Sequence, residues 1–365
     1  MTLRVATFNV ENLFTRAAAL NLASWADGRP ILDDIEELNR LLAQDDYDAA
    51  AKAQIKAILD KYEFGDRNKT NRPFGINEVR DKLFKVPAGT KKVEIVATGR
   101  DDWVGWVELA RDKISGEAVA NTGRVIDAVN PDIACLVEVE NRMALGRFNE
   151  QVLGEEFQKS FAFDLLVDGN DPRGIDLAIL SRHPVSTVRP HIHDGAPSRI
   201  FSRDCPEYEI LLPSGESLWV LANHFKSKGY GAPAESNAKR ARQAARAAEI
   251  YQDALTRSDY VIVSGDLNDR PDSVPLKALV QDTDLRDVMT HPSYPGAPGT
   301  YETGNSLNQK IDYILLSPAL WAKVENVAVE RRGVWAPHTF PSFPEVTSSV
   351  TQASDHAAVW VDLDL

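Results

Sequence analysis

Two short clusters of polar residues lie where predicted buried strands end or begin. Asp266 and Asn268 follow the apolar run 260–263, and Asp355 and His356 precede the run 357–361. Carboxylate, carboxamide and imidazole groups at strand ends are suited to holding a hard cation and activating a water for attack on phosphorus. Each cluster alone also fits a turn, a helix N-cap or a surface pair. Together they favour a catalytic site.

Further polar residues lie at the ends of other predicted strands. Residues 7–12 close the first strand, Glu138 ends another, His224 follows an apolar run, and Asp312 opens one. A hard cation prefers carboxylate oxygen, so Glu138 is the best single candidate for a metal ligand. Glu140 competes with it, because the two-residue period of a strand places both on one face.

In this order the motifs resemble the endonuclease/exonuclease/phosphatase superfamily. The resemblance covers residues 3–12 and most of the chain from about residue 121 to 365. It implies a four-layer αββα sandwich, in which two mixed β-sheets pack face to face, helices flank them, and the active site lies at one end. The many short apolar segments with few helices are also typical of an α/β protein with stacked sheets.

The resemblance also implies a divalent cation, Mg²⁺ or Mn²⁺. Beside Glu138, the residues that match the family's metal site are Asn9, Glu11 and Asp355. Many relatives have Gln-Glu where this chain has Val137 and Glu138, so the carboxylate is retained and its neighbour differs.

Five residues match the catalytic positions of the family. Asp266 and Asn268 match the pair that orients the attacking water and holds a phosphate oxygen. His356 matches a catalytic imidazole, and Asp312 the acid that fixes its tautomer. His224 matches the second histidine, which stabilises the pentacovalent state or protonates the leaving group.

Substrate contacts are expected from three places. Arg173 precedes a strand that aligns with a substrate-facing strand of the family, and its guanidinium fits two phosphate oxygens. Asp176 would orient Arg173 or approach the metal. Asn12, Lys226 and Lys228 lie in the first motif and the His224 motif.

A basic helix is predicted over residues 236–255. Seven basic and three acidic residues lie between Lys226 and Arg257, a local charge of +4. We expect one face to be basic, with Lys239, Arg242 and Arg246, and another to be apolar, with Ala241, Ala245, Ala248 and Leu255. The basic face is either solvated or binds a phosphate-rich substrate.

The whole chain of 365 residues is acidic, with a net charge of −13. This argues against a broad non-specific grip on nucleic acid, although a local basic groove remains compatible with it. Two cysteines, Cys135 and Cys205, form no disulfide framework, and no disulfide-linked partner is expected. The sequence shows no signal peptide and no membrane-spanning segment, which predicts a cytoplasmic protein without membrane partners.

We expect one domain over residues 1–365, interrupted by an insertion at about 15–120. Its first part, 31–62, has helical spacing of apolar residues and predicts two amphipathic helices, and residues 27–63 have a net charge of −5. Its second part, 82–108, resembles a hairpin or ribbon built from 91–98 and 103–108. Trp103 and Trp106 either stack on bases, cap a cleft or pack beneath a loop.

Three functions compete. The favoured one is a metal-dependent phosphodiester hydrolase, a nuclease acting on DNA or RNA with water activated by metal and aspartate. The alternative is a phosphatase or phosphodiesterase for a small phosphorylated molecule, with the insertion closing the cleft against polymers. A non-catalytic binding protein would not need every matched catalytic residue, so the complete set argues against it.

Overall fold

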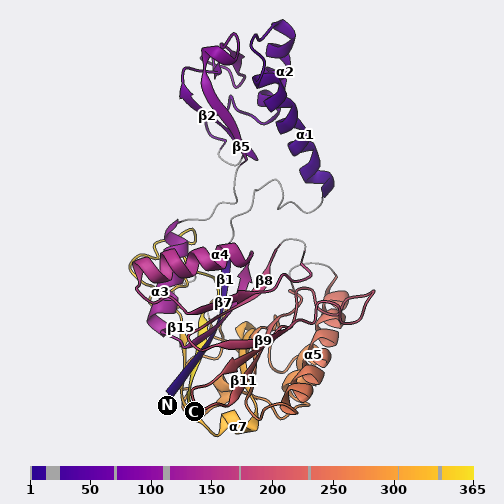
Figure 1. Ribbon diagram of the computed structural model, residues 1–365, viewed down its shortest axis with the longest axis vertical. Helices are drawn as coiled ribbons and strands as arrows, with labels where there is room; N and C mark the ends of the chain where they lie inside the picture. Colours follow the sequence, from indigo (N-terminus) through magenta and orange to yellow (C-terminus); the bar gives the residue numbers. More distant parts are fainter. Residues whose placement is uncertain are drawn as a thin grey trace. The chain divides into compact units, whose positions relative to one another are not determined.

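The chain divides into two compact units in a computed structural model. The structure describes residues 2–13, 25–69, 72–109, 116–171, 174–228, 232–302, 304–335 and 339–365. The sandwich unit comprises Met1–Phe14 and Ile114–Leu365, and the insert comprises Thr15–Lys113. Figure 1 labels their helices and strands.

Two six-stranded mixed sheets form the sandwich unit. In spatial order, the first contains β15 (Val324–Glu330), β16 (Ala358–Asp364), β1 (Thr2–Leu13), β6 (Ile133–Val139), β8 (Asp176–Ser181) and β7 (Phe163–Leu166). The second contains β13 (Arg286–Asp287), β14 (Asp312–Leu316), β12 (Val261–Asp266), β11 (Ser217–His224), β10 (Glu207–Leu211) and β9 (Val185–Arg189). β1 runs parallel to β6, and β11 runs parallel to β12.

The core between the sheets follows from the two-residue period of the strands. Val5, Cys135 and Leu177 of the first sheet share one buried cluster with Val220 and Ile262 of the second. The alternate residues face outward, where helices cover them. This arrangement removes apolar surface on both faces of each sheet from water, the main favourable term in folding.

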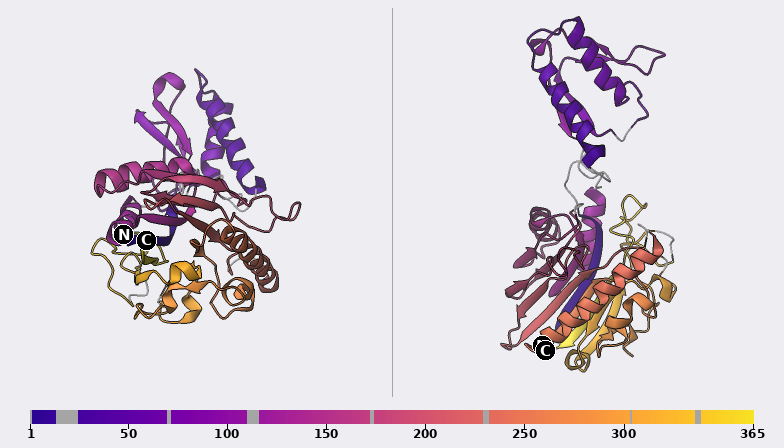
Figure 2. Two further views of the ribbon diagram at one scale, coloured as in Figure 1. Left: turned by 60° about the horizontal axis from the view of Figure 1, so that its bottom comes forward. Right: turned by 90° about the vertical axis from the view of Figure 1, so that its right-hand side faces the viewer.

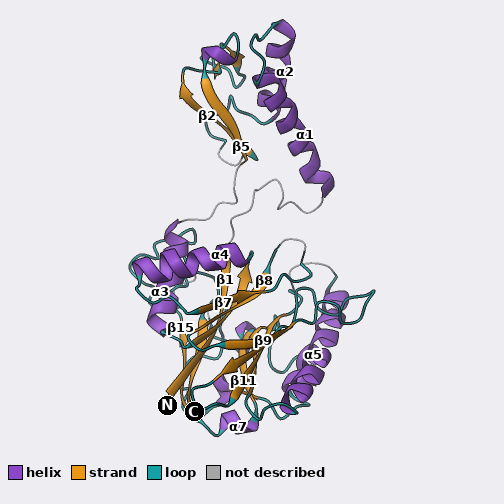
Figure 3. Ribbon diagram, viewed as in Figure 1, coloured by secondary structure: helices purple, strands orange, loops and turns teal. Residues whose placement is uncertain are grey.

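Helices form the two outer layers (Figures 2 and 3). The first sheet packs against α3 (Gly116–Val129), α4 (Arg142–Arg147) and the π-helical segment η3 (Phe148–Glu156). The second packs against α5 (Pro233–Leu255) and α6 (Lys277–Val280). The predicted αββα sandwich is confirmed. No helix in the described part of the chain is long and apolar enough to cross a membrane.

The predicted apolar face of α5 is only partly correct. Ala245 is exposed, whereas Ala248 and Leu255 are partly buried and pack on the second sheet beside the fully buried Ala244, Ala247, Ile250, Tyr251 and Ala254. Arg240 and Gln243 are buried on this same side, where both hold the main chain of Lys226: Gln243 accepts from its nitrogen at 2.8 Å, and Arg240 donates to its oxygen at 2.9 Å. Arg240 and Gln243 therefore interrupt the apolar periodicity from which the core face of α5 would be predicted.

Two edge strands lack the apolar run that predicts a strand from sequence. β9 and β15 lie at the edges of their sheets and contain exposed and half-buried residues in mixed order. An edge strand packs on fewer neighbours than a central one, so its sequence lacks the long apolar run that marked β6 or β12.

The insert has a core of its own. Its helices α1 (Trp25–Leu42) and α2 (Ala49–Lys61) confirm the predicted pair. Its strands are β2 (Phe74–Arg80), β3 (Phe84–Lys85), β4 (Glu94–Ile95) and β5 (Val104–Leu109). The predicted pairing of 91–98 with 103–108 is wrong, because β5 pairs with β2 and β4 pairs with β3. Phe74 and Trp103 lie in the core with α1 and α2, which draws β2 to β5.

Candidate active site

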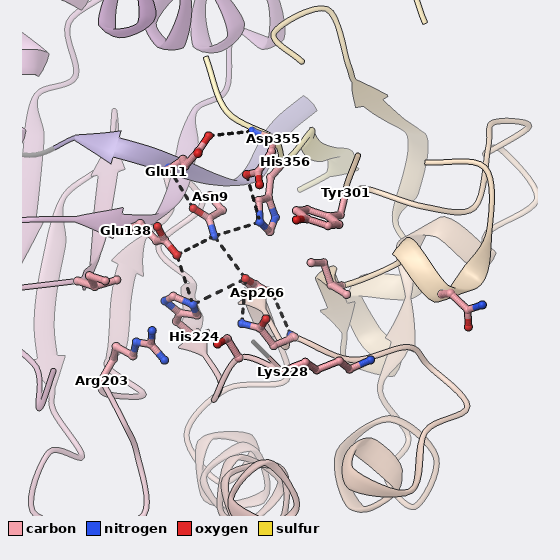
Figure 4. A pocket seen from close by; sticks show the side chains of 15 residues that line it. Asn9, Glu11, Glu138, Arg203, His224, Lys228, Asp266, Tyr301, Asp355 and His356 are labelled. Atoms are coloured by element: carbon pink, nitrogen blue, oxygen red, sulfur yellow. Dashed lines mark hydrogen bonds and ion pairs between the residues drawn. The ribbon is translucent and has the colours of Figure 1, made fainter. Parts of the chain in front are cut away.

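A pocket of about 440 Å³ lies at one end of the sandwich unit, where strands of both sheets end (Figure 4). Nine of the predicted site residues line it: Asn9, Glu11, Glu138, His224, Lys228, Asp266, Asn268, Asp355 and His356. They come from β1, β6, β11, β12 and the loops after β11 and β12 and before β16. Residues 9 and 356 meet because β1 and β16 are antiparallel neighbours in the first sheet, and residues 9 and 266 meet because both sheets end at this point.

Irregular backbone aims three of these side chains. Glu11, Glu138 and Asn268 have φ values of 53°, 69° and 54°, in the left-handed region that non-glycine residues seldom adopt. The pairing of β6 with β8 shifts register between Val137 and Val139, so Glu138 sits at a bulge. A bulge redirects a side chain, and the alternation that made Glu140 a competitor is broken there. Glu138 faces the pocket.

The predicted metal ligands lie together. The Asn9 amide nitrogen is 3.4 Å from Glu138 Oε1, and the Asp355 backbone N–H donates to Glu11 Oε2 at 3.1 Å. Burial and the charge of Asp355 raise the pKa of Glu11 to about 7, and burial raises the pKa of Glu138. Oxygen donors whose negative charges oppose one another fit a divalent cation, which would offset that repulsion.

His356 and Asp312 form a buried pair. His356 Nδ1 lies 2.9 Å from Asp312 Oδ2, which also accepts a hydrogen bond from the Thr300 hydroxyl at 2.6 Å. Burial alone lowers the pKa of His356, but the charge of Asp312 and its hydrogen bond outweigh burial and raise it well above its ordinary value. The pair therefore presents the other ring nitrogen, Nε2, to the pocket as a donor.

His224, Asp266 and Asn268, at the ends of β11 and β12 in the second sheet, line the side of the pocket opposite the predicted metal ligands. His224 Nε2 lies 3.7 Å from Asp266 Oδ2 and 3.7 Å from Glu138 Oε1. The Asn268 amide donates to Asp266 Oδ2 at 3.1 Å. Burial and the charge of Asp312 raise the pKa of Asp266 to about 7. A carboxylate of that pKa accepts a proton from water near neutral pH.

A second trio also meets the distance requirement for a cation. Ligand atoms of Asp266, Asp312 and His356 lie within 4.8 Å of one another. The short hydrogen bond of Asp312 to His356 explains this closeness and already occupies one imidazole nitrogen. We therefore favour the partly buried carboxylates that line the pocket, Glu11, Glu138 and Asp355.

The five residues predicted to bind substrate differ in where the structure places them. Lys228 lines the pocket and pairs with Asp269 at 2.6 Å. Asp176 is buried away from the pocket lining and accepts from the Gly169 N–H at 2.9 Å. Lys226 is absent from the lining, and its backbone anchors α5. Arg173 and the side chain of Asn12 lie outside the described residues.

Arg203 and Tyr301 also line the pocket and were missed. Arg203 is 4% exposed, and its Nε lies 3.1 Å from Asp171 Oδ2. The Tyr301 ring centroid lies 5.0 Å from that of His356. Arg203 lies in an irregular segment before β10 with no motif around it, so its sequence gave no signal. Tyr301 is far from His356 in the sequence, and the two residues meet only through the tertiary fold, so the sequence could not predict this contact.

The sequence matches the Endonuclease/Exonuclease/phosphatase family over residues 114–356. This chain belongs to that family. It is accordingly a phosphoric ester hydrolase of a type that depends on a divalent metal. A search among curated protein sequences found no match.

Solved structures with similar folds share little sequence identity with this family member. Truncated TDP2 from Caenorhabditis elegans is 18% identical, with a TM-score of 0.49 over 68% of this chain and 90% of that one. An endonuclease/exonuclease/phosphatase from Beutenbergia cavernae is 19% identical, with a TM-score of 0.48 over 70% and 67%. A 3'-5' exonuclease from Neisseria meningitidis is 18% identical, with a TM-score of 0.47 over 68% and 95%.

Proposed function

We propose that this chain is a nuclease that hydrolyses phosphodiester bonds of DNA or RNA. Its metal would be Mg²⁺ or Mn²⁺, held by Glu138 together with Asn9, Glu11 and Asp355. A cation bound there would neutralise charge on the phosphate oxygens. We also retain the cytoplasmic location as part of the proposal.

The remaining steps fall to side chains. Asp266 takes the proton of the attacking water, and the Asn268 amide keeps this carboxylate oriented through its 3.1 Å hydrogen bond. His356, protonated and held by Asp312, donates to a phosphate oxygen, where it opposes the charge that develops during attack. His224 lies across the pocket, near Glu138, where it stabilises the same charge or protonates the leaving oxygen.

One observation favours a polynucleotide over a small ester. Burial, together with the positive charges of Arg203 and Arg242, lowers the pKa of Lys239. These three cations therefore lie near one another, and Arg203 lines the pocket. Asp171, the ion-pair partner of Arg203, offsets part of this charge, so the excess positive charge lies at Lys239 and Arg242 on α5, where it would meet a phosphate beyond the scissile bond. A small ester with a single phosphate group has no second phosphate that could bind to this positive region.

Arg246 provides a matched control. It lies on the same helix, but it pairs with Asp194 at 2.7 Å and with Glu249 at 2.8 Å. The predicted basic face of three residues is thus reduced to Lys239 and Arg242, and Arg246 instead stabilises the helix against the loop of Asp194.

The test compares Lys239→Ala/Arg242→Ala with Arg246→Ala. Substrates are plasmid, single-stranded DNA, RNA and bis-nitrophenyl phosphate, each with Mg²⁺ or Mn²⁺. We expect the double variant to cut polynucleotide less well and with a log–log salt slope smaller by roughly 0.7–0.9 per lost phosphate contact. Turnover of the small diester should change little in both variants. If wild type cuts no polynucleotide, or the double variant cuts it equally well, the small-molecule phosphodiesterase becomes the better reading.

A further inference from the structure

The β2–β5 ribbon of the insert has one packed face and one open face. α1 and α2 share a core with the packed face (Figure 1). Along β5 the residues alternate between the two sides, with Trp103 and Gly105 buried and Val104 and Trp106 exposed. Trp103 is fully buried, and its indole N–H donates to the Tyr47 hydroxyl at 3.0 Å, so it serves packing. Packing does not explain Trp106.

Trp106 lies at the middle of the open face. Its side chain is 53% exposed. Strand pairing places Asn77 opposite it and brings Gly75 and Glu108, two pairs along, to the same face, where the Asn77 amide donates to Glu108 Oε2 at 2.5 Å. A Cβ at Gly75 would meet nothing within 4 Å, so the space beside the indole is open. An indole plane with open space beside it can accept another flat ring, because stacking uses the π-face.

Charge on this half of the insert favours an anionic partner. Residues 67–108, which include both strands of the ribbon, contain nine basic and six acidic residues, a net charge of +3, whereas residues 27–63 have a net charge of −5. Arg80 pairs across the ribbon with Val104 and so shares the open face with Trp106. Its Nε is 3.6 Å from Asp81 Oδ2, and both side chains are 66% exposed. Such an exposed pair is weak and leaves the guanidinium available.

We propose that the open face of the ribbon binds single-stranded nucleic acid, with one base stacked on Trp106 and a neighbouring phosphate at Arg80. The inference rests on the proposed nuclease function and extends it to a second substrate contact. A flat aromatic surface beside a cation is how proteins hold unpaired strands without reading their sequence. A protein partner would be expected to cover a broader apolar patch than the exposed Val79, Val104 and Trp106 of the ribbon provide.

The test measures binding separately from cleavage. The full chain, with chelator present to prevent hydrolysis, is titrated against a fluorescein-labelled oligothymidylate, and anisotropy reports the affinity. Trp106→Ala should lower the affinity about 5- to 150-fold, the range expected for one lost stacked base. Trp106→Phe should retain most of the affinity. Trp106→Leu, which keeps apolar area without a ring system, should lose affinity as Trp106→Ala does.

Arg29 supplies a control for Arg80. Arg29 is 65% exposed on α1, and its Nε lies 3.6 Å from Asp33 Oδ2, so it matches Arg80 in both exposure and ion pairing. Arg80→Ala should weaken binding and reduce its salt dependence, whereas Arg29→Ala should do neither. Equal effects would mean that net charge alone is responsible and would overturn the assigned site.

Two outcomes separate this inference from the nuclease proposal. If wild type cuts polynucleotide while Trp106→Ala and Trp106→Leu bind as wild type does, the ribbon site is wrong and the nuclease proposal stands. If the Trp106-dependent binding is found but no polynucleotide is cut, only the nuclease proposal fails. Sedimentation adds a third arm: a wild-type dimer that Trp106→Ala converts to monomer would show self-association at this face and overturn the inference.

Discussion

The imidazole of His356 depends on a chain of buried hydrogen bonds behind it. Thr300 holds Asp312, and Asp312 holds His356, so that only Nε2 is left for the substrate. Lys310, fully buried, also donates to the main-chain oxygen of Asp312 and lies 3.2 Å from Asp287. The orientation of one ring therefore involves side chains that never approach phosphate.

We predict that Asp312→Asn lowers kcat by nearly as much as His356→Ala, about 10²–10⁴-fold, because the carboxylate acts through the ring. Thr300→Val, which removes the 2.6 Å hydrogen bond, should cost less, and Thr300→Ser should restore most of it. Steady-state kinetics on bis-nitrophenyl phosphate measure these effects. Adding Asp312→Asn to His356→Ala should have little further effect, and fully additive losses would contradict the pairing.

The second prediction at this scale concerns pH. The folded chain raises the pKa of Glu11 and of Asp266 to about 7, from unfolded values near 4. Between these values the folded state binds more protons than the unfolded state, so the free energy of unfolding falls as pH rises from about 4 to 7. Thermal unfolding in chelator should show this decline. Asp266→Asn should flatten it, and Mg²⁺ should raise the unfolding temperature of wild type most at the higher pH.

Much of this site could be predicted because its residues end buried strands, where local sequence defines both the strand and the polar residue that follows it. Glu138 and Asp266 are examples. Arg203 could not be found in that way, since its place beside Glu138 depends on how an irregular segment crosses the sheet end. Arg173 and Asn12 stay predictions.

At the scale of elements, two strands approach each other very closely directly behind the site. Gly265 in β12 pairs with Asn223 in β11, and the next pair is Asp266 with His224. A Cβ at Gly265 would lie 2.0 Å from the Asn223 carbonyl oxygen, and φ there is +125°. Only glycine permits β11 and β12 to lie this close together. Their separation sets the distance between the His224 imidazole and the Asp266 carboxylate in the next pair.

We therefore predict that Gly265→Ala destabilises the fold by about 2 kcal/mol or more and reduces turnover in the fraction that still folds. Gly215→Ala is the control, because Gly215 also has a positive φ of +87° but would place its Cβ in open space. It should cost only the backbone strain, about 1 kcal/mol. Urea unfolding measures both, and equal losses would show that φ, not the approach of β11, sets the requirement.

Elements differed in how well the sequence defined them. Central strands such as β6 and β12 are buried on both faces and read as continuous apolar runs. The strands of the insert were harder, because β2 and β5 are separated by β3 and β4 and sequence proximity favoured the wrong partner. The apolar face of α5 was only partly predicted for another reason: Arg240 is buried through its bonds to Asp269 and Lys226.

For the whole molecule, the insert and the sandwich unit have separate buried clusters. In the part of the chain that the structure describes, fifteen buried residues form the core of the insert, among them Leu38, Ile55 and Trp103, and all fifteen lie within Thr15–Lys113. We retain as a prediction that the sandwich is one catalytic domain interrupted by this segment.

We predict that a chain with residues 15–113 replaced by a Gly/Ser linker still folds and still hydrolyses bis-nitrophenyl phosphate. We expect this because, among the described residues, the three buried clusters of the sandwich unit contain none from the insert. Circular dichroism, thermal unfolding and kinetics provide the measurements, with residues 25–109 expressed alone as the complement. Loss of small-diester turnover in a shortened chain that remains folded would mean that the insert completes the active site.

β1 and β16 are neighbours in the first sheet, with Thr2 opposite Asp364 and Thr7 opposite Val359. A ribosome therefore releases β1 long before the strand that must lie beside it, and Asp355 and His356 emerge only just ahead of that strand. The first sheet therefore lacks β16 until nearly all of residues 1–365 have been made, and a chain that stops before Asp355 lacks part of the matched catalytic set. A nuclease with this strand order would stay inactive until Asp355, His356 and β16 have been made.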